Sequence, residues 1–232
     1  MIFSVKVTVP ASVKSQDAFA IASLERAKKA IEEGKFDQEI TPFTVKTRRG
    51  EVEYTTDEQP GKGNPEKIPQ MRPAFKKDGS VTAANASSIS DGAAALVLTR
   101  LSVAEEMGLK PLAKVCAHTT NSHEPEWFTT APVGAIQKLL KKVGWSKDDV
   151  DLYEINEAFA TVTMAAMKEL DLPHEKVNVH GGACALGHPI GASGARIIVT
   201  LLAAMQTYEK SKGVAGICIG GGEATALALE LM

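Results

Sequence analysis

The spacing of apolar residues along the chain separates helical from extended segments. Over residues 15–34 an apolar residue recurs every three or four positions, which predicts an amphipathic helix ended by a glycine. The same spacing over residues 132–144, with proline first and glycine last, predicts a second helix. Residues 150–155 read as a strand that leads directly into a third helix over residues 157–170. A strand that hands over to a helix is typical of α/β proteins.

Other segments are apolar on every side. The helix predicted over residues 193–208 has almost no polar face, and such a helix is buried. We therefore expect it to pack between two sheets of a layered α/β fold. Residues 93–99 are small and apolar, as in a strand covered on both faces. Residues 213–219 and 224–231 flank three glycines and predict a buried hairpin.

The remaining segments are short or irregular. A strand is predicted over residues 39–45, followed by a polar hairpin-like turn, and another strand over residues 111–118. A short helix is predicted over residues 102–107. Residues 56–80 are rich in Pro, Gly, Lys and Asp and read as a long loop. Loops of that length are often functional.

Composition excludes several classes of protein. With 232 residues, 44% of them hydrophobic, the chain can form one large domain or two small ones. A net charge of −2 and the absence of a basic cluster argue against nucleic acid or a membrane surface as partner. The longest apolar run, residues 197–205, is far below the roughly 20 residues that a membrane span needs.

The cysteines indicate a reducing compartment. Cys116, Cys184 and Cys218 are odd in number and widely spaced, which fits free thiols better than disulfides. The first residues do not read as a signal peptide, so we expect a cytoplasmic protein. No metal site is predicted, because His118 and His123 are isolated from other ligand types.

Three short blocks carry candidate chemistry. The first, Asn-Glu-Ala-Phe-Ala over residues 156–160, lies where a strand meets a helix, a common place for ligands in α/β folds. Asn156 there can hold a water or a carbonyl, or it can simply cap the helix. The second block, residues 181–196, contains five glycines around His188. That histidine can act as acid, base or oxyanion donor, or it can buttress the loop through a backbone hydrogen bond.

A third block is Cys-Ile-Gly at residues 218–220, at the end of a predicted strand. Backbone amides of the glycine turn can hold an oxyanion, and such a donor is worth about 3–4 kcal/mol in a transition state. The alternative is that Cys218 is a buried structural cysteine, because free cysteines are among the most buried residues.

Taken together and in this order, the three blocks resemble the C-terminal half of the thiolase family, in its acetyl-CoA acetyltransferase branch. Upstream segments agree, among them Arg-Pro-Ala-Phe at residues 72–75 and Val-Thr-Ala-Ala-Asn-Ala-Ser at residues 81–87. The resemblance implies a thiolase-like layered α/β fold. It also implies an acyltransferase that catalyses reversible Claisen condensation and thiolysis of acyl-CoA.

The resemblance also implies roles for individual residues. His188 matches the histidine that activates the nucleophilic cysteine and helps to bind the thioester oxygen. Asn156 matches the asparagine that positions a water in the same oxyanion site. Cys218 matches the cysteine that moves a proton on and off the acetyl-CoA methyl group. Gly220 matches the glycine whose N–H belongs to the other oxyanion hole.

Three further residues are assigned to the binding of CoA and substrate by the same resemblance. Ser87 matches a serine that lines the channel for the pantetheine arm, and Ala158 and Phe159 belong to the first block. Coenzyme A is expected as a substrate, with no covalently bound cofactor and no metal.

The chain also departs from the family pattern. A thiolase accepts the acyl group on a cysteine of its N-terminal domain, and neither Cys116 nor Cys184 lies in the context of that nucleophile. We expect residues 1–14 to be a leader outside the family and residues 15–97 to be a remnant of the loop region and the last part of the N-terminal domain. Residues 98–232 would be the C-terminal domain, with the N-terminal domain largely missing.

That departure has a physical consequence. The buried helix needs a sheet on each face, so an isolated chain would expose apolar surface. We expect either pairing with a separate N-terminal thiolase polypeptide or an inactive fragment. Dimers or tetramers are a further family inference.

Alternatives to an acyltransferase remain at this stage. One is a non-catalytic thiolase-like module that binds CoA thioesters or serves as a scaffold subunit. A ketosynthase would show two histidines in separate motifs, and here only His188 has a motif. A dinucleotide-binding enzyme would need Gly-x-Gly-x-x-Gly after a first strand, and that motif is not met.

Overall fold

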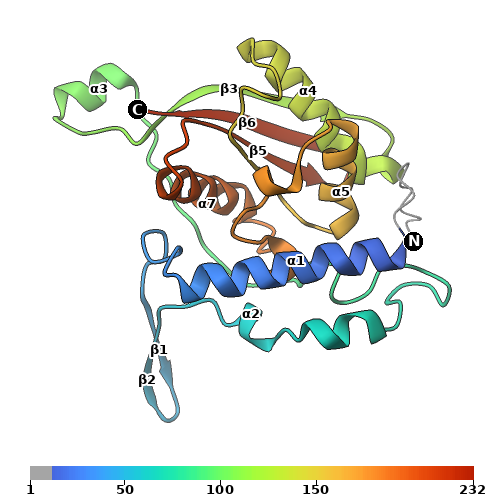
Figure 1. Cartoon of the computed structure of the whole chain (residues 1–232). Coiled ribbons are helices and arrows are strands. Elements are labelled where there is room, and N and C mark those ends of the chain that lie inside the picture. Colours follow the sequence, from blue (N-terminus) through green and yellow to red (C-terminus); the bar gives the residue numbers. More distant parts are fainter. Residues whose placement is uncertain (1–11) are drawn as a thin grey trace.

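The computed structural model describes residues 12–232, and its main sheet has four strands. In spatial order these strands are β3 (Ala113–Ser122), β6 (Glu223–Leu231), β5 (Lys212–Ile219) and β4 (Leu152–Ile155) (Figure 1). β3 pairs with β6 and β6 with β5 in antiparallel fashion, whereas β5 and β4 are parallel. The carboxyl ends of β4 and β5 therefore meet at one edge of the sheet.

Helices cover both faces of this sheet (Figure 1). α4 (Ala131–Val143) and α5 (Ala160–Glu169) pack on one face, and α7 (Ser193–Thr207) packs on the other. The apolar side chains of β6 alternate accordingly: Ala226 contributes to the first core cluster and Leu229 to the second. A sheet covered on both faces favours apolar residues on both sides of each strand, which is the pattern over most of β5 and β6.

The N-terminal residues add a further layer. α1 (Val13–Glu32) packs against α5, the short helix α6 (Ala183–Leu186) and the turn η1 (Pro65–Gln70). Ser12 caps α1, because its Oγ accepts a hydrogen bond from the Ser15 N–H at 3.1 Å. The remaining short elements are α2 (Gln59–Lys62), α3 (Leu101–Glu106), η2 (Pro125–Thr130) and η3 (His174–Lys176).

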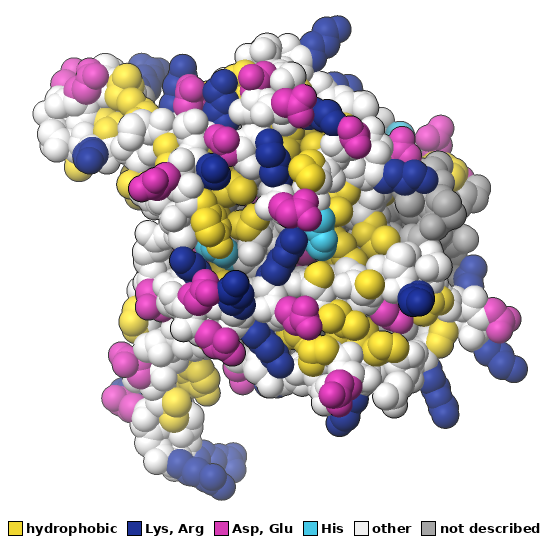
Figure 2. Space-filling view, in the orientation of Figure 1, with side chains coloured by type: hydrophobic (Ala, Val, Ile, Leu, Met, Phe, Trp, Pro, Cys, Tyr) yellow, Lys and Arg dark blue, Asp and Glu magenta, His cyan; other side chains and the backbone are white. Residues whose placement is uncertain are grey.

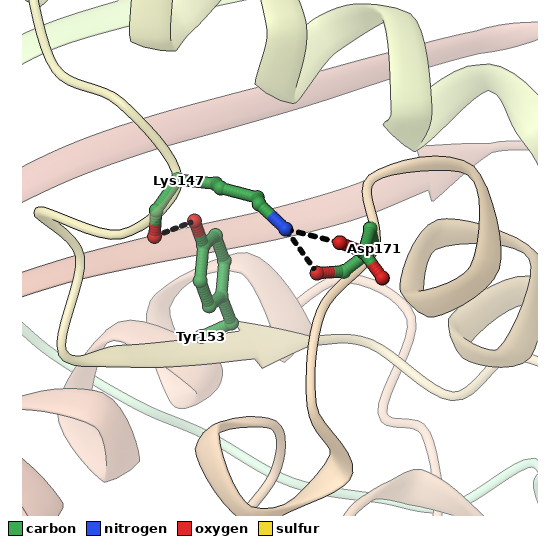
Figure 3. A network of polar contacts seen from close by, with 3 residues as sticks. All are labelled: Lys147, Tyr153 and Asp171. Carbon is green, nitrogen blue, oxygen red and sulfur yellow. Dashed lines mark hydrogen bonds and ion pairs between the residues drawn. The ribbon is translucent and has the colours of Figure 1, made fainter.

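A surface network ties the segment after α4 to the segment after α5 (Figure 3). Lys147 Nζ donates to the Asp171 backbone carbonyl at 2.9 Å and also pairs with the Asp171 carboxylate. Tyr153 on β4 donates its hydroxyl to the Lys147 carbonyl at 3.1 Å. Burial raises the pKa of the Tyr153 phenol, so this hydroxyl stays a donor. The network fixes the loop that leads into β4.

A separate hairpin, β1 (Phe43–Thr47) and β2 (Gly50–Tyr54), projects from the body (Figure 1). Phe43 pairs with Tyr54 and Val45 with Val52, so one face of the hairpin is apolar. Lys and Arg side chains gather at its tip (Figure 2). The turn predicted after residues 39–45 is therefore confirmed, with the strand placed slightly later.

The predicted helices 15–34, 132–144, 157–170 and 193–208 are confirmed as α1, α4, α5 and α7, and the predicted C-terminal hairpin as β5 and β6. The strand predicted over residues 93–99 is wrong. Within the described residues, residues 91–100 pair with no strand, and Val97 is 95% exposed. A strand needs a neighbouring edge to take up its N–H and C=O groups, and none lies beside this segment.

The environment of α7 also differs from the prediction. Only one face of the helix packs on a sheet. In place of the expected second sheet, Leu96 packs against the core cluster that contains α7, and the turn after α1 hydrogen-bonds to the helix. Gln38 Nε2 donates to the Ala203 carbonyl of α7 at 3.1 Å. Gly194 near the start of α7 is left exposed. The helix is thus buried by two different kinds of partner.

The predicted leader and the question of a membrane span remain to be placed on the structure. Of the leader predicted over residues 1–14, residues 1–11 lie outside the described part of the chain. Among residues 12–232, no helix has the length and apolar character that crossing a bilayer requires.

The packing of α4 on the sheet predicts the effect of a core truncation. Leu139 is fully buried between α4 and the sheet. Leu139→Ala is expected to lower the free energy of unfolding by about 2–5 kcal/mol, because it leaves a cavity. The exposed neighbour provides the control: Lys141→Ala should change it by less than about 0.5 kcal/mol. Urea unfolding followed by circular dichroism measures both, and equal effects would contradict the packing.

Candidate active site

The candidate site lies at the carboxyl edge of β4 and β5. Ile155 at the end of β4 is in register with Gly216 of β5. The Asn156 N–H donates to the Gly216 carbonyl at 2.9 Å, so Asn156 sits beside β5 two residues before Cys218. Gly220 begins the turn between β5 and β6. The edge of a sheet at the carboxyl ends of parallel strands is where α/β proteins bind ligands.

His188 is brought to this edge by a loop anchored on residues 88–90. The His188 N–H donates to the Ser88 carbonyl at 2.9 Å. The preceding Gly187 has φ of +81°, and a Cβ there would lie 2.2 Å from Ser90 Oγ. Glycine at 187 is therefore required both by conformation and by the close approach of the two segments.

Asn156 and His188 meet side chain to side chain. Asn156 Nδ2 lies 3.4 Å from His188 Nε2. Asn156 Oδ1 is buried and has no hydrogen-bond partner within the described residues, so it is an acceptor available to a water or ligand. Burial, with a smaller contribution from Arg196, lowers the pKa of His188, so its imidazole is neutral at neutral pH.

In the part of the chain that the structure describes, Asn156 is not a helix cap, and the His188 ring does not support the loop through a backbone hydrogen bond. α5 begins at Ala160 and its N-cap is Phe159, so Asn156 does not cap that helix. The contacts of the His188 ring are with the side chains of Asn156 and Ser193 rather than with the backbone. Both side chains are therefore held by each other and by the surrounding loop.

Glu157 is a residue whose importance the sequence pattern did not reveal. Its side chain is 1% exposed and accepts three hydrogen bonds. Ser23 Oγ donates to Oε2 at 2.7 Å, the Cys184 N–H donates to Oε2 at 3.0 Å, and Asn178 Nδ2 donates to Oε1 at 2.8 Å. Burial raises the pKa of Glu157 and these donors oppose the rise. With three donors and no acceptor among these contacts, we assign the carboxylate as ionised.

The residues predicted to bind substrate lie together next to this edge. Ser87 Oγ and Ser87 N–H both donate to the Ala158 carbonyl, at 3.0 and 3.1 Å. Phe159 forms edge-on contacts with the rings of Phe75 and Phe128, at centroid distances of 6.4 and 6.2 Å. Phe128, on η2, was missed by sequence reasoning because no motif surrounds it.

The three cysteines are free and differ in position. Burial raises the pKa of Cys218 to about 11, and it raises the pKa of Cys184 well above its usual range. Cys116 on β3 also has a raised pKa, from burial and the nearby Glu230 carboxylate. None of the three thiols is therefore held as a thiolate, the form in which cysteine is nucleophilic.

A shallow cleft opens beside His188. Residues 90–94 line one side of it, and the loop and first turn of α7, residues 189–192 with Ala195, line the other. Exposed apolar side chains surround it: Ile190 is 69% exposed and Ile89 90% exposed. No group of three or more potential metal ligands occurs anywhere in residues 12–232.

Two family descriptions match the chain in succession. That for the thiolase N-terminal domain matches residues 5–102, and that for the thiolase C-terminal domain matches residues 109–231. The layered α/β fold and the site at the β4–β5 edge agree with this class. The chain belongs to the thiolase family.

Individual relatives and solved structures indicate the same family. The chain is 48% identical over 221 residues to the acetyl-CoA acetyltransferase of Syntrophomonas wolfei, covering 94% of this chain and 56% of the relative. The crystal structure of the Bacillus anthracis acetyl-CoA acetyltransferase superposes with a TM-score of 0.92 at 47% identity, covering 95% of this chain and 56% of that one. The Acat5 thiolase of Ascaris suum, solved in complex with coenzyme A, gives 0.83 at 43% identity over the same shares.

These comparisons correct one expectation. The chain spans a little over half the length of these relatives, yet the N-terminal family description matches residues 5–102. The expectation that the N-terminal domain is largely missing is therefore not supported. The domain boundaries predicted after residues 14 and 97 stay predictions.

The Glu157 contacts predict the effect of removing its charge. Glu157→Gln keeps the shape but turns an amide N–H₂ group toward one of three donors. It should lower the free energy of unfolding by about 1–3 kcal/mol, the cost of an unsatisfied buried group. The exposed Glu169→Gln, at the end of α5, is the control and should have an effect below about 0.5 kcal/mol. Thermal and urea unfolding provide the test. If Glu157→Gln left the free energy of unfolding unchanged, the three-donor assignment would be refuted.

Proposed function

We propose that this chain supplies the acid–base half of an acyl-transfer site of the acetyl-CoA acetyltransferase type. The reaction is thiolysis of acetoacetyl-CoA by CoA to two molecules of acetyl-CoA, or the reverse Claisen condensation. The observation that carries the proposal is the contact between Asn156 Nδ2 and His188 Nε2 at the β4–β5 edge. The acetyl-CoA acetyltransferases among the relatives support the same substrate class.

In this proposal His188 and Asn156 handle the nucleophile and the thioester oxygen. A neutral imidazole can take the proton of an attacking thiol. The protonated Nε2 then donates to the thioester oxygen as the enolate charge develops on it. Asn156 Oδ1, buried without a partner, would hold a water that donates to the same oxygen.

Cys218 and Gly220 handle the carbon fragment that leaves. In thiolysis the nucleophile attacks the keto carbon of acetoacetyl-CoA, and the carbon–carbon bond breaks. Its electron pair passes to the enolate of acetyl-CoA, and the Cys218 thiol gives its proton to that carbon. A pKa of about 11 keeps Cys218 protonated at rest and suits this acid role. The Gly220 N–H would stabilise the other oxyanion, which forms on the keto oxygen when the nucleophile attacks.

CoA is proposed to bind along Ser87, Ala158 and Phe159. Support comes from their mutual contacts next to the catalytic edge and from the coenzyme A complex of the Ascaris suum thiolase. The aromatic pair of Phe75 and Phe128 against Phe159 would give the arm an apolar wall. No bound cofactor is required.

The acyl-accepting cysteine is proposed to come from polypeptide outside residues 1–232. The raised pKa values of Cys116, Cys184 and Cys218 argue against each of them as the thiolate nucleophile. A separate N-terminal thiolase polypeptide and a homo-oligomer are the proposed partners. The three free cysteines support a reducing compartment, and we propose the cytoplasm. A purely scaffolding role has no observation in its favour.

Thiolysis should depend on His188 and Cys218. With the complementary thiolase polypeptide added, His188→Ala and Cys218→Ser should each lower kcat by about 100- to 10,000-fold, the range for a lost general acid or base. The exposed His118→Ala and the β3 variant Cys116→Ser are matched controls and should retain activity. Loss of acetoacetyl-CoA absorbance measures the rate. Unchanged rates in both site variants would refute the proposed roles, and fast cleavage by this chain alone would refute an external nucleophile.

The thiols of the isolated chain should react slowly with iodoacetamide. A pKa of about 11 for Cys218, against 9.0 for an ordinary thiol, leaves about 100-fold less thiolate at neutral pH. Labelling should therefore be much slower than for free cysteine, and Cys184 should be slow for the same reason. Peptide mass spectrometry follows each site. A cysteine of this chain that labels rapidly and is protected by acetyl-CoA would identify an internal nucleophile instead.

A further inference from the structure

Ser193 contacts the His188 imidazole on the side opposite Asn156. Its Oγ lies 2.6 Å from His188 Nδ1, while Nε2 faces Asn156 Nδ2. Ser193 is the first residue of α7 and is fully buried. Its hydroxyl also lies 3.0 Å from the Pro189 carbonyl, one turn back. The imidazole is thus held between two side chains from different elements.

The protons in this chain of contacts can be assigned by counting donors. A serine hydroxyl has one proton and can accept a further hydrogen bond. If Ser193 donates to the Pro189 carbonyl, its oxygen must accept from His188 Nδ1–H. Nε2 then carries the lone pair and accepts from Asn156 Nδ2. In this arrangement every contact has one donor and one acceptor.

The opposite tautomer fits these contacts less well. A proton on Nε2 would face the Asn156 amide N–H₂ group, so that two donors oppose each other unless the amide turns. Nδ1 would then need the only proton of Ser193, which would leave the contact with the Pro189 carbonyl without a hydrogen.

We propose that Ser193 is a positioning residue that holds His188 in the Nδ1–H tautomer, with the Nε2 lone pair directed into the site. This role in the reaction rests on the proposed function. A thiol can deliver its proton only to a ring nitrogen that carries a lone pair. In doing so it displaces the long contact of 3.4 Å between Asn156 Nδ2 and Nε2. After transfer, Nδ1–H remains bonded to Ser193 Oγ, so the ring does not rotate between accepting the proton and returning it. Among residues 12–232 no carboxylate hydrogen-bonds to this imidazole; the hydroxyl of Ser193 does.

The tautomer can be read directly on the 232-residue chain. Long-range ¹H–¹⁵N correlation spectra distinguish a ring nitrogen that bears hydrogen from one that does not. Wild type should show hydrogen on Nδ1 of His188. Ser193→Ala should move the proton toward Nε2, and Ser193→Thr, which keeps the hydroxyl, should preserve the wild-type pattern. Thr200→Val, which removes a buried hydroxyl from the same helix without touching His188, is the control and should change nothing at the ring.

Hydrogen on Nε2 in wild type, or an unchanged pattern in a folded Ser193→Ala, would overturn the proposal. Thiolysis is the second arm. Ser193→Ala should lower kcat by about 10- to 100-fold, the range for a lost hydrogen bond to a group that becomes charged, with little change in KM. Ser193→Thr should recover most of the rate. If wild type shows the Nδ1–H tautomer but no thiolysis occurs with any partner polypeptide, the proposed function fails and the role of Ser193 in setting the tautomer stands.

Discussion

The buried carboxylate of Glu157 is the interaction on which the candidate site depends. It joins α1, through Ser23, to the segment after η3, through Asn178, and to the glycine-rich loop, through the Cys184 N–H. Asn178 in turn bonds both the N–H and the carbonyl of Ile155. An ion taken out of water is tolerated only when its oxygens are satisfied, so these segments can pack in few other ways.

The rest of the site follows from that constraint. The glycine-rich loop must approach the carboxylate closely, and a Cβ on Gly182 would lie 2.3 Å from Glu157 Cδ. Once this loop is fixed, its continuation carries His188 over Ser88 and places Ser193 at the start of α7. Asn156, next to Glu157 in the chain, is fixed by the same anchor. Packing, backbone conformation and the placement of the two polar side chains therefore have one common cause.

Sequence reasoning succeeded where the relevant signal is local. The periodicity that predicts α1, α4 and α5 depends on neighbouring residues, and Asn156 and His188 were found because they stand in dense local motifs. Ser193 and Glu157 also lie in those motifs, but their roles depend on contacts with segments distant in the sequence, such as Ser23 and Asn178. The strand predicted over residues 93–99 was wrong because strand formation needs a partner edge, which composition cannot reveal.

The charge states of the candidate site can be considered together with the exposed surface beside it. Burial raises the pKa of Cys218 and lowers that of His188, so both groups rest in their neutral forms. In the proposed thiolysis a neutral base starts the reaction and a neutral acid ends it, with no net charge to be stabilised at rest. The cleft beside His188 is nevertheless open and rimmed by exposed apolar residues such as Ile190. A polypeptide that covers this rim would exclude water and strengthen each hydrogen bond to the reacting oxygen. The proposed external nucleophile has to reach His188 beside this rim, so we expect the polypeptide that carries it to cover part of the same surface.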